Sequence, residues 1–289
     1  MMRIAMMSGL IPRQSITAIG WSRVKLSTNT IVSKEDNFNN RGITILTLNN
    51  GKVNAFSREM VSALQDMLSE IRRDLSARVL IIRSANERVF CAGADLKERM
   101  QMTEVEVASF VSKLRATITQ VSTLSIPSIA VIEGSALGGG LELALAADYR
   151  VCASHSQIKL GLPECTLGII PGAGGTQRLP KLVGASNAKR LIYGGEIISP
   201  VEALSMGLID QLHENPYEAA MMLAEKWAHY SSPIALRMAK LAINGGIDLP
   251  LASGLALEEM CYAQVVPTED RKEALLAFAE KRKPIFKGK

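Results

Sequence analysis

Short runs of β-branched and aliphatic residues alternate with amphipathic segments along this chain, and this alternation constrains its fold more than any other feature. Residues 42–48 (GITILTL), 79–82 and 128–132 have the composition of buried strands. Between these runs, residues 57–73 and 103–121 repeat apolar side chains at helical spacing. Strands that alternate with helices in this way predict an α/β fold.

Helix-start signals and a later change of pattern divide the chain. Ser57 is placed to cap the first helix, and Thr103 with Glu106 forms a capping box for the next one. Toward the C-terminus helical segments dominate, and residues 233–244 and 251–263 have the clearest periodicity. The predicted organisation is a leader (1–34), a core (35–200) and a helical C-terminal region (201–289).

Basic residues are concentrated in the leader. Its five basic residues, with no acidic residue among them, are Arg3, Arg13, Arg23, Lys25 and Lys34. The chain carries 33 basic and 28 acidic residues, so the other 28 basic residues balance the acidic ones and the body is formally neutral. An acid-free N-terminus that bears Arg and Ser is typical of an organellar transit peptide, for the mitochondrion or the plastid, and we expect it to be cleaved or disordered. The alternative is an N-terminal extension with this composition by chance.

Several classes of function are disfavoured by composition and motifs. Four cysteines without a CxxC pair and three scattered histidines predict neither a disulfide scaffold nor a metal site. The longest uncharged run, residues 116–132, contains Gln, Ser, Thr and Pro and predicts no membrane span. Gln177 interrupts a GxGxxG pattern, and Ser135 lies in GSALG rather than GxSxG. A dinucleotide fold and a serine nucleophile are therefore disfavoured.

Two glutamates are isolated charges within apolar, glycine-rich segments. Glu142 is the only charged residue in ALGGGLELALAA, and Glu164 is the only charge between Lys159 and Arg178. Buried carboxylates are costly, so isolated ones are usually paired, protonated or functional. Together they predict a general acid–base pair. The structural alternative for either one is a carboxylate that accepts hydrogen bonds from backbone amides at a helix start.

Glycine-rich turns add a second chemical device. Residues 138–140 are glycines ahead of a predicted helix, where backbone N–H groups are unhindered and free of helical partners. Residues 91–95 (CAGAD) form another turn of small residues between a predicted strand and a polar helix. N–H groups from both turns could stabilise a developing oxyanion. The structural alternative for each is a turn needed for close packing.

Long motifs in this sequence resemble the crotonase, or enoyl-CoA hydratase, superfamily. They are FCAGADLKERM, ALGGGLELALAADYRV, GLPECTLGIIPGAGGTQRLPKLVG and PTEDRKEALLAFAEKRKPIF, and the likeness covers residues 42–289. FCAGADLKER, GGGLELALA and MCYAQ are most similar to the branch that holds mitochondrial enoyl-CoA hydratases and methylglutaconyl-CoA hydratases. The resemblance implies a crotonase-like ββα spiral core with a helical C-terminal trimerisation region, assembled as a homotrimer or homohexamer.

The resemblance also implies roles for particular residues. The substrate would be a 2-trans-enoyl thioester of coenzyme A, with its thioester oxygen between the N–H groups of Ala94 and Gly139. Glu164 would exchange a proton with the α-carbon, and Glu142 would orient the water that attacks the β-carbon. The product would be a 3-hydroxyacyl-CoA, which makes the protein a hydro-lyase of the mitochondrial matrix. No cofactor is implied, because coenzyme A is part of the substrate.

Contacts to coenzyme A carry over from the resemblance as well. The implied residues are Lys52, Ala55, Ala92, Asp95, Leu96, Lys97, Phe278 and Lys281. The last two match positions that reach the ligand of a neighbouring subunit in the family. The alternative for the lysines is a solvated surface charge.

Four functions remain open at this point. The first is an enoyl-CoA hydratase of fatty-acid beta-oxidation or branched-chain amino-acid degradation, and the second is the methylglutaconyl-CoA hydratase of leucine degradation. The third is an RNA-binding protein. Residues 57–76 carry three arginines, four acids and no lysine, so nucleic-acid binding is not expected there. The fourth is an inactive crotonase-like scaffold, against which the presence of both Glu142 and Glu164 argues.

Overall fold

The computed structural model describes residues 31–37 and 42–289, and its largest element is a mixed sheet in the order β1-β2-β3-β5-β7-β10. Its strands are β1 (Val32–Asn37), β2 (Ile43–Leu48), β3 (Val79–Ser84), β5 (Ser128–Ile132), β7 (Tyr149–Ala153) and β10 (Gln211–His213). β1 pairs antiparallel with β2, and the other neighbours pair in parallel. The predicted strands over residues 42–48, 79–82 and 128–132 are confirmed as β2, β3 and β5.

A smaller sheet has the order β4-β6-β8-β9. Its strands are β4 (Val89–Cys91), β6 (Ser135–Leu137), β8 (Leu160–Gly161) and β9 (Ile197–Ile198). The chain visits the two sheets in turn: β3 is followed by β4, β5 by β6 and β7 by β8, and a helical segment ends each round. This repeat is the ββα spiral that the resemblance implied.

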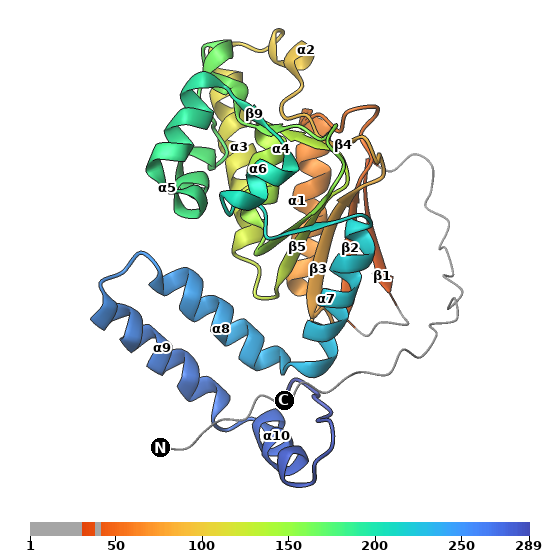
Figure 1. Cartoon of the computed structure of the whole chain (residues 1–289), viewed down its shortest axis with the longest axis vertical. Coiled ribbons are helices and arrows are strands. Elements are labelled where there is room, and N and C mark those ends of the chain that lie inside the picture. Colours follow the sequence, from red (N-terminus) through yellow and green to blue (C-terminus); the bar gives the residue numbers. More distant parts are fainter. Residues whose placement is uncertain (1–30, 38–41) are drawn as a thin grey trace.

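Helices cover both faces of the large sheet. Helix α7 (Pro216–Tyr230) packs on one face, and α1 (Arg58–Arg73) and α3 (Glu104–Ser122) lie on the other (Figure 1). The other helical segments of the spiral are α2 (Leu96–Arg99), α4 (Gly139–Ala146), the 3₁₀ helix Pro163–Leu167, α5 (Gly175–Gly194) and α6 (Pro200–Ser205). The predicted caps are confirmed: Ser57 accepts a hydrogen bond from the Met60 N–H, and Thr103 and Glu106 form a capping box.

The strands distribute their side chains between two apolar cores, as the period of two in a strand requires. Leu80 and Ile82 of β3 belong to the core shared with α1 and α3. Val79 and Ile81, the residues that alternate with them, belong to the core beneath α7. The sheet is therefore buried on both faces, which explains why its strands read as continuous apolar runs.

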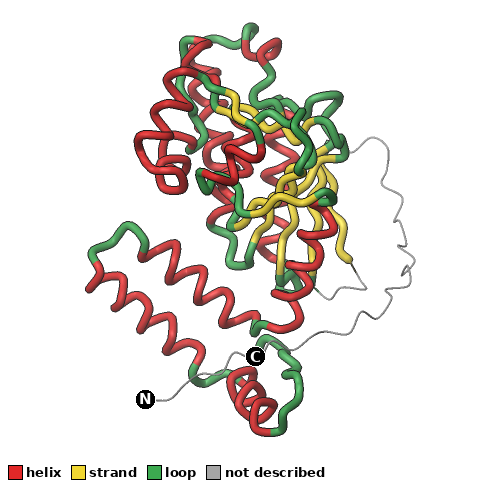
Figure 2. The backbone as a smooth tube through the Cα atoms, in the orientation of Figure 1, coloured by secondary structure: helices red, strands yellow, loops and turns green. Residues whose placement is uncertain are grey.

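Three helices extend from the body as an arm. They are α8 (Pro233–Gly246), α9 (Leu251–Val265) and α10 (Glu269–Ala279), and they confirm the predicted helices over residues 233–244 and 251–263. Figure 2 shows the arm as helix and loop, set apart from the strands of the body. Its buried residues are few: Pro233 in α8, Cys261 in α9, and Asp270 and Ala277 in α10. Within the described ranges no helix is both long and apolar enough to cross a membrane.

Strand β1 begins at Val32, before the predicted end of the leader at residue 34. Val32 is buried and pairs with Leu48 across the β1–β2 ladder, and Lys34 forms ion pairs with Asp36 and Glu70. Strand β1 reads VSKEDN, so it lacks the apolar alternation that would have separated it from the basic segment before it. Residues 1–30, on which the transit-peptide prediction otherwise falls, lie outside the described residues.

Candidate active site

Glu142 is a buried carboxylate held by backbone amides. It lies in the first turn of α4, a helix whose residues are all buried, and is 2% exposed. Its Oε1 atom accepts hydrogen bonds from the N–H groups of Ala173 (2.8 Å) and Gly175 (2.7 Å). Burial raises the pKa of Glu142, and the two amides oppose that rise because they stabilise the ionised form. The amides therefore fix the carboxylate in one orientation.

Glu164 is also a buried carboxylate, but it has fewer hydrogen bonds to offset its burial than Glu142 has. It lies in the 3₁₀ helix Pro163–Leu167 and is 8% exposed. Its Oε2 atom is buried and has no hydrogen-bond partner among the described residues. Burial raises the pKa of Glu164 to about 7, and the negative charge of Glu142 adds to this rise. A carboxyl group with this pKa can both give and accept a proton near neutral pH.

Gly138 brings the glycine turn against Glu164. A Cβ atom at position 138 would lie 2.9 Å from the Glu164 Oε1 atom, and the backbone there has a φ of 51° and a ψ of −129°. A side chain would therefore be both strained and in contact with the carboxylate. Because Gly138 has no side chain, the space between the Glu164 carboxylate and the start of α4 stays open.

The two predicted amide donors lie on adjoining segments. A Cβ atom on Gly93 would lie 3.2 Å from the Gly139 nitrogen, so the turn over residues 91–95 touches the start of α4. Phe56 forms a parallel bridge with Ala94, in which the Phe56 N–H donates to Gly93 and the Asp95 N–H donates to Phe56. Within the described chain, the N–H groups of Ala94 and Gly139 donate to no protein acceptor. Both donors are therefore free for a ligand.

Gly140 explains why the turn contains several glycines. A Cβ atom at this position would lie 2.1 Å from the carbonyl oxygen of Cys91, well inside van der Waals contact. The contact joins α4 to the end of β4, the strand that leads into the Ala94 turn. Backbone packing thus fixes the two amide-bearing segments relative to each other.

Six of the predicted coenzyme A contacts come together on two adjoining loops and the first turn of α2. They are Lys52, Ala55, Ala92, Asp95, Leu96 and Lys97. The loops are joined by hydrogen bonds from the Ala92 N–H to the Val53 carbonyl (3.0 Å) and from Asn86 Nδ2 to the Lys52 carbonyl (2.6 Å). Asp95 caps α2, because its carboxylate accepts from the N–H groups of Lys97 and Glu98. Lys52 and Lys97 are exposed, as a ligand on this surface would require.

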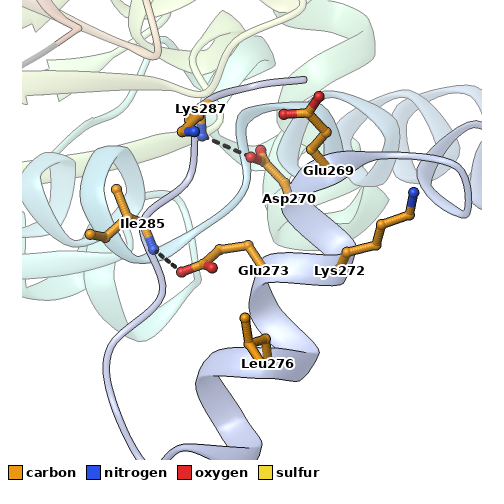
Figure 3. A pocket seen from close by; sticks show the side chains of 7 residues that line it. All are labelled: Glu269, Asp270, Lys272, Glu273, Leu276, Ile285 and Lys287. Atoms are coloured by element: carbon orange, nitrogen blue, oxygen red, sulfur yellow. Dashed lines mark hydrogen bonds between the residues drawn. The ribbon is translucent and has the colours of Figure 1, made fainter.

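The other two predicted contacts lie elsewhere in the protomer. Phe278 and Lys281 are exposed at the end of α10, which lies at the opposite end of the molecule from α2 and α4 (Figure 1). Between α10 and the C-terminal tail lies a pocket of about 310 Å³ (Figure 3). Asp270 and Glu273 accept hydrogen bonds there from the N–H groups of Lys287 and Ile285. That pocket is separate from the two buried glutamates.

Sequence reasoning missed the residues that hold Glu142. Ala173 lies in the glycine-rich loop before α5, and Gly175 begins that helix. The sequence marked this segment as an interrupted nucleotide-binding pattern and as part of a family motif, but not as a set of donors to Glu142. Arg178 donates to the Ala173 carbonyl, and Arg115 donates to the Gly172 carbonyl on the same loop. A buried carboxylate needs donors, and a glycine-rich loop can supply unhindered amides. In the described ranges no group of three or more His, Cys, Asp or Glu side chains is placed to hold a metal ion.

The spiral fold, the paired carboxylates and the free amides define a protein of the crotonase class, and comparison with known proteins gives its family. The model of the enoyl-CoA hydratase/isomerase family matches residues 38–289, so the chain belongs to that family. It is 49% identical to the mitochondrial methylglutaconyl-CoA hydratase of Homo sapiens over 257 residues, which cover 86% of this chain and 75% of that protein. It is 50% identical to the probable mitochondrial enoyl-CoA hydratase 2 of Arabidopsis thaliana, over 81% of this chain and 78% of that protein.

A solved structure agrees. The chain is similar to the enoyl-CoA hydratase from Bacillus anthracis, with a TM-score of 0.86 and 45% identity. The likeness covers 90% of this chain and all of that one. The helical C-terminal arm therefore lies within the shared fold.

Proposed function

We propose that this protein is a hydro-lyase that adds water across the double bond of a 2-trans-enoyl-CoA to give a 3-hydroxyacyl-CoA. Membership of the enoyl-CoA hydratase/isomerase family supports the reaction class. The observation that carries the assignment is the pair of buried glutamates, one fixed by two amides and the other unpaired with a pKa of about 7.

The amides act on the thioester. Its oxygen gains negative charge as the double bond accepts water, and the N–H groups of Ala94 and Gly139 would donate to it. Fixed backbone donors need no reorganisation during the reaction, so they favour the transition state over the ground state. They also polarise the double bond and make the β-carbon electrophilic.

The carboxylates divide the work of adding water. The water oxygen bonds to the β-carbon, and Glu142 accepts the proton that this water loses. Protonated Glu164 gives its proton to the α-carbon, and proton transfer from Glu142 restores it. The amides on Glu142 favour its ionised form, which suits a base, whereas burial favours protonated Glu164, which suits an acid.

Methylglutaconyl-CoA hydration is the second candidate. It is favoured by the 49% identity to the human methylglutaconyl-CoA hydratase. Either activity belongs to acyl-CoA breakdown, in fatty-acid beta-oxidation or in branched-chain amino-acid degradation. Several relatives are named as mitochondrial proteins, which supports a mitochondrial location. The acid-free composition of the leader supports import into the matrix through a transit peptide.

The arm supports a homotrimer, or a hexamer of two trimers. Its helices leave large apolar side chains exposed, among them Leu255, Tyr262 and Phe278. Exposed apolar faces of this kind favour burial against another chain. In such an assembly Phe278 and Lys281 would contact coenzyme A bound to a neighbouring subunit, which accounts for their distance from the site within one protomer.

A panel of three thioesters tests the function. We expect the purified protein to hydrate crotonyl-CoA, decenoyl-CoA and methylglutaconyl-CoA with different kcat/KM values, and the highest value identifies the acyl preference. A gel-shift titration with RNA at several salt concentrations covers the RNA-binding alternative. Folded protein that hydrates none of the three thioesters would support an inactive scaffold instead.

A further inference from the structure

Three consecutive peptide groups at residues 172–175 lie against the Glu142 carboxylate. The N–H groups of the first and the third peptide, those of Ala173 and Gly175, both donate to the Glu142 Oε1 atom. The carbonyl oxygens of the same three peptides also accept hydrogen bonds. The place of Glu142 therefore depends on the groups that bind these carbonyls.

Two arginines from different helices supply donors to this loop. Arg115 of α3 donates from Nε to the Gly172 carbonyl (2.7 Å), which belongs to the same peptide group as the Ala173 N–H. Arg178 of α5 donates to the next carbonyl, that of Ala173 (2.9 Å), and to Thr119 Oγ1 of α3 (3.2 Å). The two guanidinium groups thus bind consecutive peptides.

Gly174 lets the Arg178 side chain lie directly against the loop. A Cβ atom at position 174 would lie 2.0 Å from the Arg178 Nη1 atom, and the φ angle of Gly174 is 116°. The Gly174 carbonyl, the third of the set, accepts from the N–H groups of Gln177 and Arg178 in the first turn of α5. The loop, the start of α5 and the Arg178 guanidinium therefore form one closely packed unit.

Helix α3 braces this unit from the side. Helices α3 and α5 both pack against α4, which carries Glu142 (Figure 1). Arg115 and Thr119 are four residues apart, so they lie on the same face of α3. A charged donor on a carbonyl polarises the peptide, and the N–H group of that peptide becomes a stronger donor. Arg115, the peptide between residues 172 and 173, and Glu142 are thus joined in one chain of hydrogen bonds.

The charges around Glu142 agree with this arrangement. Within the described chain, the charged groups that face it are Arg115 of α3, Arg178 of α5 and Glu164 of the 3₁₀ helix. Strands β4 and β6, which also pack on α4, carry no charged residue, and burial raises the pKa of the Cys91 thiol to about 12. Burial raises the pKa of Glu142, and the two amides, followed by the two arginines, oppose this rise.

We propose that Arg115 and Arg178 are positioning residues, which act through the loop at residues 172–175 to hold the Glu142 carboxylate in place as the general base. The inference rests on the proposed hydratase function, because that function makes Glu142 the base. Each guanidinium acts through a peptide group, so contact with the substrate is not part of the role.

Arg178→Met removes both side-chain donors of the more buried arginine. We expect kcat with the preferred thioester to fall by roughly 10- to 100-fold, the loss typical of hydrogen bonds from a charged group. KM should change by less than about 3-fold, because the predicted coenzyme A contacts lie on other loops. The acidic limb of the pH profile of kcat/KM should move up by about one pH unit, since ionised Glu142 loses a favourable charge. Arg178→Lys keeps the charge and should recover part of the loss.

Two further variants make the result specific. Arg115→Met alters an exposed side chain, so the protein should fold, and its acidic limb should move in the same direction by a smaller amount. Arg190→Met is the control in the same helix as Arg178. Arg190 is exposed and pairs with Glu196 and Glu202, so kcat, KM and the pH profile should stay unchanged. A lower Tm with the acidic limb at its wild-type pH in both Arg115→Met and Arg178→Met would overturn the inference.

Infrared titration separates this inference from the hydratase function. Protonated carboxyl groups absorb at frequencies where carboxylates do not, and subtraction of the Glu142→Gln spectrum isolates the signal of Glu142. We expect the midpoint for Glu142 to rise in Arg178→Met and in Arg115→Met, and to stay unchanged in Arg190→Met. This result in a protein that hydrates no thioester would contradict the hydratase function alone. An unchanged midpoint in Arg178→Met and Arg115→Met would contradict the role of the two arginines.

Discussion

The body of this protein buries its apolar side chains, whereas the arm leaves many of its apolar side chains exposed. In the body, β2 and β3 bury nearly every residue, and the helices close over both faces of the sheet. In the arm, Tyr262 is 67% exposed and Phe278 is 86% exposed. Side-chain caps at the starts of α8 and α10 and the packing of α8 against α9 stabilise the helices of the arm. The arm buries few side chains of its own.

This difference assigns two roles, catalysis and assembly, to different parts of one chain. The body contains both candidate catalytic carboxylates and both free amide donors, so it supplies all the groups that the proposed hydration uses. The arm exposes large apolar side chains, a kind of surface that favours burial against another chain. The body therefore specifies the reaction, and the arm is suited to specify the assembly.

The largest effect should come from adding one methyl group to the body. Gly140→Ala places a Cβ atom 2.1 Å from the Cys91 carbonyl oxygen, and we expect little or no folded, soluble protein. The matched change in the arm is Gly254→Ala, whose Cβ atom would lie 3.5 Å from the Gly246 carbonyl oxygen. This second variant should fold with an unchanged free energy of unfolding, or with one that is higher by about 0.5–1 kcal/mol, because alanine has the higher helix propensity. Soluble yield and calorimetry measure the folding of the two variants. Equal losses of folded protein in Gly140→Ala and Gly254→Ala would contradict the contrast in packing between body and arm.

The second prediction concerns the exposed face of the arm. The double variant Leu255→Glu/Tyr262→Glu puts two charges on α9, and we expect it to be monomeric where the wild type is trimeric or hexameric. Leu75→Glu, at a position of the body that is 85% exposed, is the control and should not change the assembly. Light scattering at micromolar concentration measures the mass. A monomeric wild type would remove Phe278 and Lys281 from the coenzyme A site.

The third prediction concerns the tail that fastens α10. Asp270 accepts a hydrogen bond from the N–H group of Lys287 (Figure 3). It also accepts from the N–H group of Gly288 and from the Ser232 hydroxyl. Asp270→Ala should lower the free energy of unfolding by about 1–3 kcal/mol, because these donors lose their acceptor. We expect carboxypeptidase to remove the tail faster from this variant. Glu269→Ala, the exposed neighbour, should resemble the wild type in both assays.

The fourth prediction is a pH dependence that originates in the body. Burial raises the pKa of Glu164 to about 7, whereas the pKa of Glu273 in the arm is lowered to about 2 by Arg282. Hydration requires protonated Glu164 and ionised Glu142, so kcat/KM should fall up to about tenfold per pH unit well above 7, and should fall again at acidic pH where Glu142 becomes protonated. A profile that stays flat to pH 9 would contradict this role.

The same pKa has a consequence for stability. A carboxyl group whose folded-state pKa is raised is stabilised in its protonated form, and that stabilisation is lost as the pH rises through the folded pKa. The Tm of the wild type should therefore fall, relative to Glu164→Gln, between about pH 4.5, the ordinary pKa of a glutamate, and about pH 7, the folded-state pKa. Thermal melts across this window measure the difference, and parallel curves would contradict it.

Local signals predicted most of the regular structure. The caps at Ser57 and Thr103 and the apolar runs of β2, β3 and β5 are encoded by neighbouring residues, so the sequence indicated them directly. The small sheet was not predicted, because its strands have two or three residues and show no period. Such strands exist only because the larger sheet brings them together.

The candidate site was predictable to a similar extent. The isolation of Glu142 and Glu164 among apolar residues is visible in the sequence, and so are the glycines beside them. The donors to Glu142 were missed because Ala173 lies 31 residues away and binds through its backbone, which no side-chain motif records.

The most direct test of the catalytic assignment is the turnover of Glu164→Gln and Glu142→Gln, measured beside their Tm. Each glutamine keeps the shape of the side chain and removes its acid–base function. We expect each variant to lose roughly 10²–10⁴-fold in kcat, with KM changed much less and the double variant losing less than the product. The structural alternative, in which both carboxylates serve only as acceptors for backbone amides, gives a lower Tm with activity nearly intact. Folded Glu164→Gln or Glu142→Gln with a kcat near that of the wild type would contradict the hydratase mechanism.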